Sequence, residues 1–181
     1  NLASNAARGH RDVGLFEIGR VFRASHDPDR DEPLHLAVAW TGLADPSWLG
    51  DRRSVDGRDS VALLERVATA LGRPMRVRSA QAPPDWAHPG VYAEVWVDGV
   101  KAGWVGYVHP EPLDPYELDA TVVALELDLS AWLAAERVAR THHTQNRNPA
   151  ALRDAAFTVD ASLPFDRLRD ALDAFEHPFI E

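Results

Sequence analysis

The stretch HPGVYAEVWVDGVKAGWVGYVHP, residues 88–110, decides the fold that this sequence predicts. On both sides of Asp98-Gly99, residues alternate as they do in β-strands that bury one face. An Asp-Gly pair between two such runs is the strongest short signal for a two-residue hairpin turn. We therefore expect strands at 91–97 and 101–108, paired antiparallel around that turn.

Two glycines lie inside the second strand of this hairpin, Gly103 and Gly106. A glycine within a strand often marks a β-bulge or a close approach of another backbone, so we expect tight packing there. His88 and His109 bracket the hairpin, and its closure would bring them near one another. We expect each ring to be a turn residue satisfied by backbone or water; the alternative is a metal site.

Further strands are predicted by β-branched, aromatic and alternating apolar residues at 13–23, 34–43, 75–79 and 121–129. Two adjacent prolines and a third soon after them predict a loop at 81–90. Trp48, in the long connection between the second strand and the first helix, is expected to fold back over the core.

A helix is predicted at 60–71, with Asp59 or Ser60 as its N-cap and with Gly72 and Pro74 ending it. Its apolar face consists of Leu63, Leu64, Val67, Ala68 and Leu71. A shorter helix is predicted at 130–139, where Ser130 is a possible cap. A mostly antiparallel sheet with a few helices packed on it is an α+β fold.

The last forty residues predict one more β-α unit, with a strand at 151–160 and a helix at 163–175. The apolar stripe of this helix consists of Phe165, Leu168, Leu172 and Phe175.

Composition limits the classes of protein to consider. A length of 181 residues suits one domain, or one domain and part of another. The chain has no cysteine, which excludes disulfides and zinc-thiolate sites. It has no run of 18 apolar residues and no basic region followed by an apolar one at its start, so we expect neither a membrane span nor a secretory signal, and a cytoplasmic location.

The charge of the chain is acidic overall but uneven. Its formal net charge is −9, from 28 acids and 19 bases, which argues against strong nucleic-acid binding by this chain alone. Residues 137–153 nevertheless contain no acid. Their arginines are candidate phosphate contacts, with a solvated linker as the alternative: Arg137, Arg140, Arg147 and Arg153.

Motifs of self-sufficient catalysis are missing from the sequence. It contains no HExxH zinc motif, no GxSxG nucleophile turn and neither of the glycine-rich phosphate loops, GxxxxGK[ST] or GxGxxG. We therefore predict no catalytic, cofactor-binding or metal-binding residues in this chain. A stand-alone metal-dependent hydrolase built on His88 and His109 remains the alternative from a different class.

Three segments, in this order, resemble the β subunit of bacterial phenylalanyl-tRNA synthetase. Asn1–Phe22 is similar to that family's NxxxNxxRGxxDVxLFEIGRVF stretch. Residues 88–110 are similar to its HPGxxAxxxxDGxxxGxxGxxHP hairpin, and ALELDL at 124–129 to the strand that follows. NPAALRDAAFTVD, at 148–160, is similar to the start of its C-terminal anticodon-binding module.

The resemblance implies a synthetase-like module at 1–140, shortened at its N-terminal side, that has the class II synthetase fold without the catalytic motifs. It implies that 141–181 is a basic linker and the first β-α unit of a ferredoxin-fold anticodon-binding module. That fold needs four strands and two helices, so the apolar stripe of the last helix would lack the sheet it covers. We then expect this unit to be loosely ordered, or docked on residues 1–140 or on a neighbour.

The same resemblance implies a function as scaffold and subunit interface of phenylalanine–tRNA ligase. The α subunit would be the partner in an (αβ)2 heterotetramer and would handle ATP, magnesium and phenylalanine. Transfer RNA for phenylalanine would be bound through the complete β subunit. A protein-interaction module descended from a synthetase is the remaining alternative.

Overall fold

The computed structural model describes residues 1–22, 32–45, 49, 52–80, 82–138, 151 and 154–175. The chain divides into two compact units, Asn1–Val138 and Ala139–Glu181. All strands that the structure describes belong to the first unit. None of the described helices is long and apolar enough to cross a membrane.

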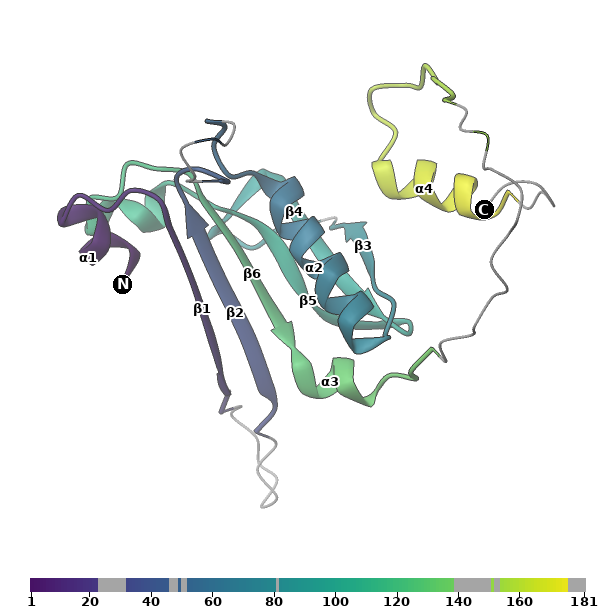
Figure 1. The fold of residues 1–181 in the computed structure, drawn as a ribbon, viewed down its shortest axis with the longest axis horizontal. Helices are drawn as coiled ribbons and strands as arrows, with labels where there is room; N and C mark the ends of the chain where they lie inside the picture. Colours follow the sequence, from purple (N-terminus) through teal and green to yellow (C-terminus); the bar gives the residue numbers. More distant parts are fainter. Residues whose placement is uncertain are drawn as a thin grey trace. The chain divides into compact units, whose positions relative to one another are not determined.

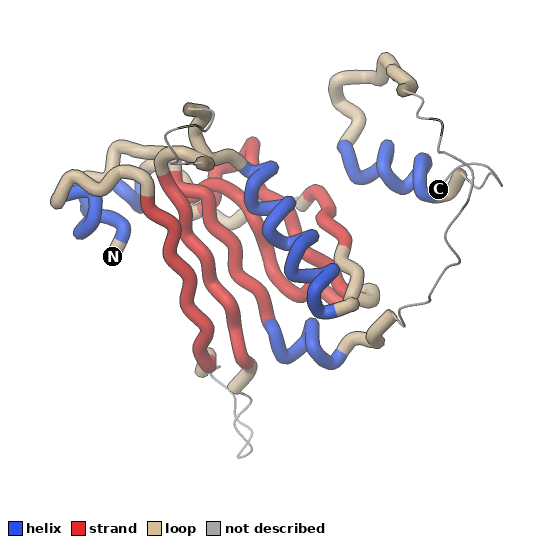
Figure 2. The backbone as a smooth tube through the Cα atoms, viewed as in Figure 1, coloured by secondary structure: helices blue, strands red, loops and turns tan. Residues whose placement is uncertain are grey.

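The first unit is built on a six-stranded sheet, counted over the described residues, in which every neighbouring pair is antiparallel (Figure 1; Figure 2). Its strand order is β1-β2-β6-β5-β4-β3. The strands are β1 (Val13–Arg20), β2 (Leu34–Thr41), β3 (Arg76–Ser79), β4 (Ala87–Val97), β5 (Val100–Val108) and β6 (Val122–Asp128). This sheet confirms the predicted α+β class and the strands predicted at 13–23, 34–43, 75–79, 91–97, 101–108 and 121–129.

Helices of different lengths accompany the sheet. In the first unit they are α1 (Leu2–Ala7), α2 (Gly57–Leu71), the 3₁₀ helix η1 (Glu111–Tyr116) and α3 (Leu129–Ala134). The long helix α2 packs on one face of the sheet and contacts β5 and β6 (Figure 1).

The predicted hairpin is confirmed in its turn and its register. Val97 pairs with Val100, which leaves Asp98 and Gly99 as a two-residue loop. Both loop residues have positive φ, 50° and 75°, as a type I′ turn requires. This turn matches the right-handed twist of the strands that it joins, and so the local sequence fixes the pairing of β4 with β5.

The two glycines of β5 lie where other backbones approach closely, as predicted. A Cβ on Gly103 would lie 2.1 Å from the carbonyl oxygen of Glu126 in the neighbouring strand β6. A Cβ on Gly106 would lie 2.5 Å from the carbonyl oxygen of Val91 in β4. The register of β4 against β5 also shifts between Val95 and Trp96, next to Gly103. Any larger residue at either glycine would push two central strands apart.

The core lies between the sheet and α2. Its largest fully buried side chains are Trp132, Leu64, Leu127, Val95 and Val123. Trp132, on α3, is completely buried and donates its indole N–H to the carbonyl oxygen of Arg73, just past the end of α2, at 3.3 Å. The indole thus fixes α3 against α2 as well as filling the core.

The start of α2 differs from the prediction. The helix begins at Gly57 and its N-cap is Asp56, not Asp59 or Ser60. Asp56 accepts the backbone N–H of Arg58, and Asp59 accepts the backbone N–H of Asp56, which together form a capping box. The box uses Asp in place of the usual Glu at its second position, and the sequence pattern therefore placed the cap three or four residues late. The end at Gly72 is confirmed, with φ of 64°.

Two further predictions about helix and strand starts were wrong. The predicted loop 81–90 becomes strand from Ala87 onward. Pro89 lies in an irregular stretch between the paired residues Ala87 and Tyr92, where its missing N–H breaks no regular ladder. The cap of α3 is Asp128, which accepts the N–H of Ala131 at 2.8 Å. Ser130 lies inside that helix, where its hydroxyl accepts the N–H of Leu34.

The second unit holds helix α4 (Phe165–Asp173), which confirms the predicted helix at 163–175. The described residues 154–160 are not a strand, contrary to the prediction. A strand needs a neighbour to satisfy its backbone, and the described part of this unit supplies no second extended segment. Phe165, Leu172 and Phe175 of the α4 stripe are exposed. Trp48 lies outside the described residues.

We predict that Gly103→Ala lowers the free energy of unfolding by about 1–3 kcal/mol, because the new methyl group overpacks the β5–β6 contact. Chemical denaturation with tryptophan fluorescence measures this change. Gly19→Ala is the matched control, since a Cβ there meets only the end of the Glu17 side chain at 3.9 Å. Equal stability of the two variants would contradict the role assigned to Gly103.

Candidate functional site

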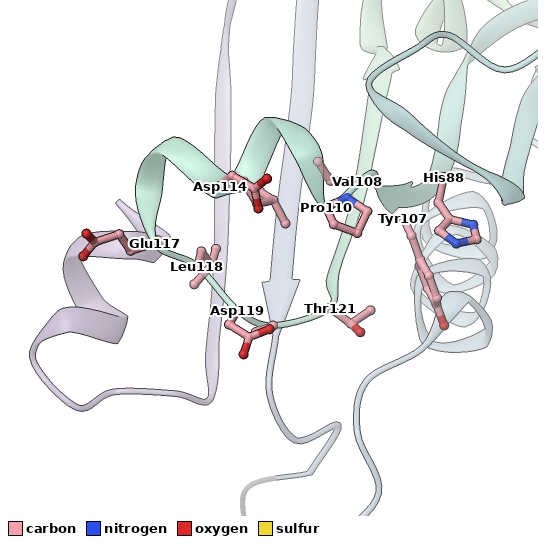
Figure 3. A pocket seen from close by; sticks show the side chains of 11 residues that line it. His88, Tyr107, Val108, Pro110, Asp114, Glu117, Leu118, Asp119 and Thr121 are labelled. Carbon is pink, nitrogen blue, oxygen red and sulfur yellow. The ribbon is translucent and has the colours of Figure 1, made fainter.

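The strand ends that bracket the hairpin open onto a hollow of about 870 Å³ (Figure 3). Its lining comes from the ends of β4 and β5, from η1 and from the segment that leads into β6. The lining residues are His88, Tyr107, Val108, Pro110, Leu113, Asp114, Glu117, Leu118, Asp119, Ala120 and Thr121. This volume is within the range of small-molecule sites, so the chemistry of its polar residues decides what it can do.

The two histidines that bracket the hairpin lie near one another, as predicted, and each accepts a nearby backbone N–H. Their ring centroids lie 6.5 Å apart. His88 Nδ1 accepts the backbone N–H of Gly90 at 3.1 Å, and His109 Nδ1 accepts that of Glu111 at 3.3 Å. Each ring thus accepts the backbone N–H of the residue two positions later, and a proline lies between the two residues. Both rings are satisfied by backbone, as predicted, but His88 lies in strand β4 rather than in a turn.

The metal-site alternative gains no support from this geometry. With Nδ1 occupied by a backbone N–H, each ring offers only Nε2 as a further ligand atom. A catalytic zinc needs three protein ligands. Among the described residues, no three His, Asp or Glu side chains are grouped so that they could hold a metal ion.

Tyr107 links the hollow to the start of α2. Its hydroxyl accepts the backbone N–H of Gly57, the first residue of that helix, at 3.3 Å. The ring of Tyr107 also contacts that of His88, with centroids 6.3 Å apart. The phenol therefore satisfies one of the N–H groups that a helix start leaves without an intrahelical partner.

The carboxylates of the hollow do not converge on the histidines. Asp114 lies on η1, and Glu117 and Asp119 lie in the segment after it. Figure 3 shows Glu117 at the opposite end of the lining from His88 and Tyr107. General acid–base catalysis needs the two groups within reach of one reacting atom, and this arrangement does not provide that.

A cluster of ion pairs lies at the start of helix α2. Arg58 bonds to the Asp56 carboxylate, and Arg53 to that of Asp59, with closest N–O distances of 2.6 and 2.5 Å. The side-chain bond from Arg58 holds the pKa of Asp56 below its usual range. The bond from Arg53 does the same for the pKa of Asp59. Sequence reasoning missed this cluster, although the Asp-x-x-Asp spacing before an apolar helix face signals it.

A second polar pair that the sequence did not predict lies on the sheet face opposite α2. His35 Nδ1 is 2.7 Å from Glu126 Oε1, joining β2 to β6. The two residues are 91 positions apart, and only strand pairing brings them together.

The predicted phosphate contacts are only partly described. Arg137 is exposed at the end of the first unit, and its side chain lies against Gly72. The other predicted arginines lie outside the described residues: Arg140, Arg147 and Arg153. The contact of these four arginines with nucleic acid stays a prediction.

The fold and the site together define an antiparallel α+β module. In it, His88, His109, Tyr107, Asp56 and Asp59 use their side chains to accept backbone N–H groups at strand ends and at the start of α2. The family model described as the phenylalanyl-tRNA synthetase β chain CLM domain matches residues 1–129, and the chain belongs to this family. The resemblance found in the sequence is thereby confirmed.

Curated relatives agree with this assignment. The chain is 35% identical, over 181 residues, to the phenylalanine–tRNA ligase β subunit of Bordetella parapertussis, with 94% of this chain and 22% of the relative covered. It is 35% identical over 170 residues to the β subunit of Xylella fastidiosa, with 92% of this chain and 21% of the relative covered. The chain thus spans about a fifth of the length of these relatives.

We predict that Asp56→Ala lowers the free energy of unfolding by about 1 kcal/mol at neutral pH, the usual cost of losing an N-cap. An acid with a lowered pKa adds stability above its ordinary value of 3.8, and that stability disappears as the pH falls through the folded-state value. The difference between Asp56→Ala and the parent chain should therefore shrink in strong acid.

Urea denaturation at neutral pH and at pH values below 3.8 measures that difference. Asp114→Ala, an exposed acid on η1, is the control and should change stability by less than about 0.5 kcal/mol at either pH. A difference for Asp56→Ala that grows in acid would contradict the assigned role.

Proposed function

We propose that this chain is the non-catalytic scaffold and subunit interface of a phenylalanine–tRNA ligase β subunit. In that enzyme tRNA is charged with phenylalanine at the cost of ATP, and the α subunit carries out the chemistry in an (αβ)2 assembly. The observation that supports this proposal best is the family match over residues 1–129. The hairpin site adds to it, because His88, His109 and Tyr107 all bond to backbone N–H groups.

The finer architecture belongs to the same proposal. We take the first unit as a class II synthetase-like core; its six-stranded antiparallel sheet with one long helix on a face is compatible with that. We take the second unit as the start of a ferredoxin-like anticodon-binding module. The exposed stripe on α4 supports this, since Phe165 and Phe175 are 73% and 62% exposed and would pack against a sheet.

ATP and magnesium belong to the complete enzyme in this proposal. Magnesium is usually held by carboxylates and by the phosphates of its nucleotide. The described residues contain no grouping of three possible metal ligands, and the whole sequence has no phosphate-binding loop. We therefore assign the nucleotide and metal sites to the rest of the enzyme.

Co-expression with the cognate α subunit of phenylalanine–tRNA ligase tests the proposal. We expect the 181-residue chain to co-purify with the α subunit as one complex, and to form no phenylalanyl-adenylate by itself. Pyrophosphate exchange measures adenylate formation. Failure to bind the α subunit, or adenylate formation by this chain alone, would contradict the proposal.

Metal analysis of the purified chain separates the proposal from a stand-alone hydrolase. We expect no stoichiometric zinc or manganese, because both hairpin histidines are already engaged by backbone N–H groups. Stoichiometric metal that disappears in His109→Ala would favour the hydrolase instead.

Binding of tRNA should be weak and strongly dependent on salt. Four arginines in a chain of net charge −9 neutralise few phosphates, so we expect no measurable binding at physiological salt and weak binding at low salt. Filter binding across a salt series measures this. Arg137→Ala should reduce the salt slope by about one unit, whereas the exposed Arg66→Ala on α2 should not. Tight binding that is insensitive to salt would refute this prediction.

A further inference from the structure

The chain that follows α3 crosses the C-terminal end of α2, beside which α3 lies (Figure 1). Val138 donates its backbone N–H to the carbonyl oxygen of Gly72 at 2.8 Å. The side chain of Arg137 lies against the same glycine, since a Cβ added to Gly72 would be 3.3 Å from the Arg137 Nε. Residues 136–138 therefore form a strap over this helix end.

The strap satisfies part of the backbone at the end of α2. A helix end leaves its last carbonyl groups without a donor from the helix itself. The carbonyl of Leu71 accepts a bond from Nη1 of Arg73 at 3.3 Å. The carbonyl of Gly72 accepts the N–H of Val138, and that of Arg73 accepts the indole N–H of Trp132 at 3.3 Å. The strap thus supplies one of three successive donors.

Arg73 joins the helix end to the residue from which the strap starts. Besides the bond from Nη1 to Leu71, its Nε donates to the carbonyl oxygen of Ala135, the C-cap of α3, at 3.0 Å. The side chain is partly buried. Bonds from a charged donor are stronger than those between neutral groups. Arg73 is therefore the side chain that holds the start of the strap against α2.

Hydrogen bonds, and not apolar burial, hold the strap in place. All three of its residues are exposed, and Val138 is 59% exposed. Trp132, on the helix before it, is completely buried. A segment with few buried apolar contacts opens locally, without unfolding of the core. The strap can therefore leave the helix end while α3 stays anchored by Trp132.

We propose that residues 136–138 are a releasable strap that sets where the connection between the two units begins. The boundary between the units falls after Val138, the residue that bonds to Gly72. With the strap docked, the connection begins at that residue. With the strap released, it begins at Ala135, and three more residues add roughly 10 Å of reach. The device lies wholly within the first unit and does not depend on the proposed function.

Amide hydrogen exchange of the full 181-residue chain, followed by NMR, tests the proposal. We expect the Val138 amide to be protected in the parent chain. In Arg73→Ala it should exchange at least about tenfold faster, because the bond from a charged donor at the base of the strap is lost. The amides of the central strands β5 and β6 should keep their protection. Arg66→Ala, an exposed arginine of the same helix, is the control and should leave Val138 unchanged.

Arg73→Lys is the second variant, and it keeps the test decisive if Arg73→Ala does not fold. Lysine keeps the positive charge and the apolar stem of the partly buried side chain. It lacks the planar fork with which arginine bonds to two carbonyl groups at once. The Val138 amide should therefore lose protection in this variant too, again without a change in β5 and β6.

Three results would overturn the proposal. Exchange of the Val138 amide in the parent chain at the rate of an unstructured amide would show that the strap is not docked. Full protection of that amide in both Arg73 variants would show that Arg73 does not hold it. Equal loss of protection in β5 and β6 would show that the whole unit opens, and not the strap alone. These outcomes are read from the chain by itself and are independent of the α-subunit test.

Discussion

Helix α2, the main cover of the core, is narrower than the sheet of six strands that the described residues form, and the rest of the structure depends on that mismatch of width. Six strands at their usual spacing are roughly 24 Å across, whereas a helix with its side chains is about 10–12 Å wide. Helix α2 therefore covers the middle of the sheet, where it contacts β5 and β6, and leaves the outer strand β1 open. Burial follows this geometry: Leu127 of β6 is fully buried, while Phe16 of β1 is mostly exposed.

Helix α2 is the main cover of the core. The groups that fix its two ends therefore contribute to the stability of the whole first unit. Tyr107 and the Asp56–Asp59 capping box hold its start, and Trp132 holds the segment after its end through the carbonyl of Arg73. Tyr107 also lines the hollow at the hairpin ends. Two polar residues of the hollow, His88 and Tyr107, thus use their side chains to hold a strand end and the start of the helix.

The family assignment and the geometry address different questions. Membership in the synthetase β chain family rests on the match over residues 1–129. The structure shows how those residues pack and which hydrogen bonds they form. The described residues also leave apolar surfaces exposed. The apolar side of β1 and the stripe on α4 are two such surfaces, each on its own unit.

The sequence by itself determined the hairpin, its turn and the close approach at Gly103 and Gly106, because these depend on local alternation and on residues with no side chain. It also determined the family, through motifs that keep their order along the chain. Only the tertiary structure decided the pairing of His35 with Glu126, the strand order that makes β1 an edge, and which apolar faces α2 leaves open. The physical reason is that long-range pairing and the reach of one helix are properties of the packed sheet. A local sequence pattern therefore does not predict them.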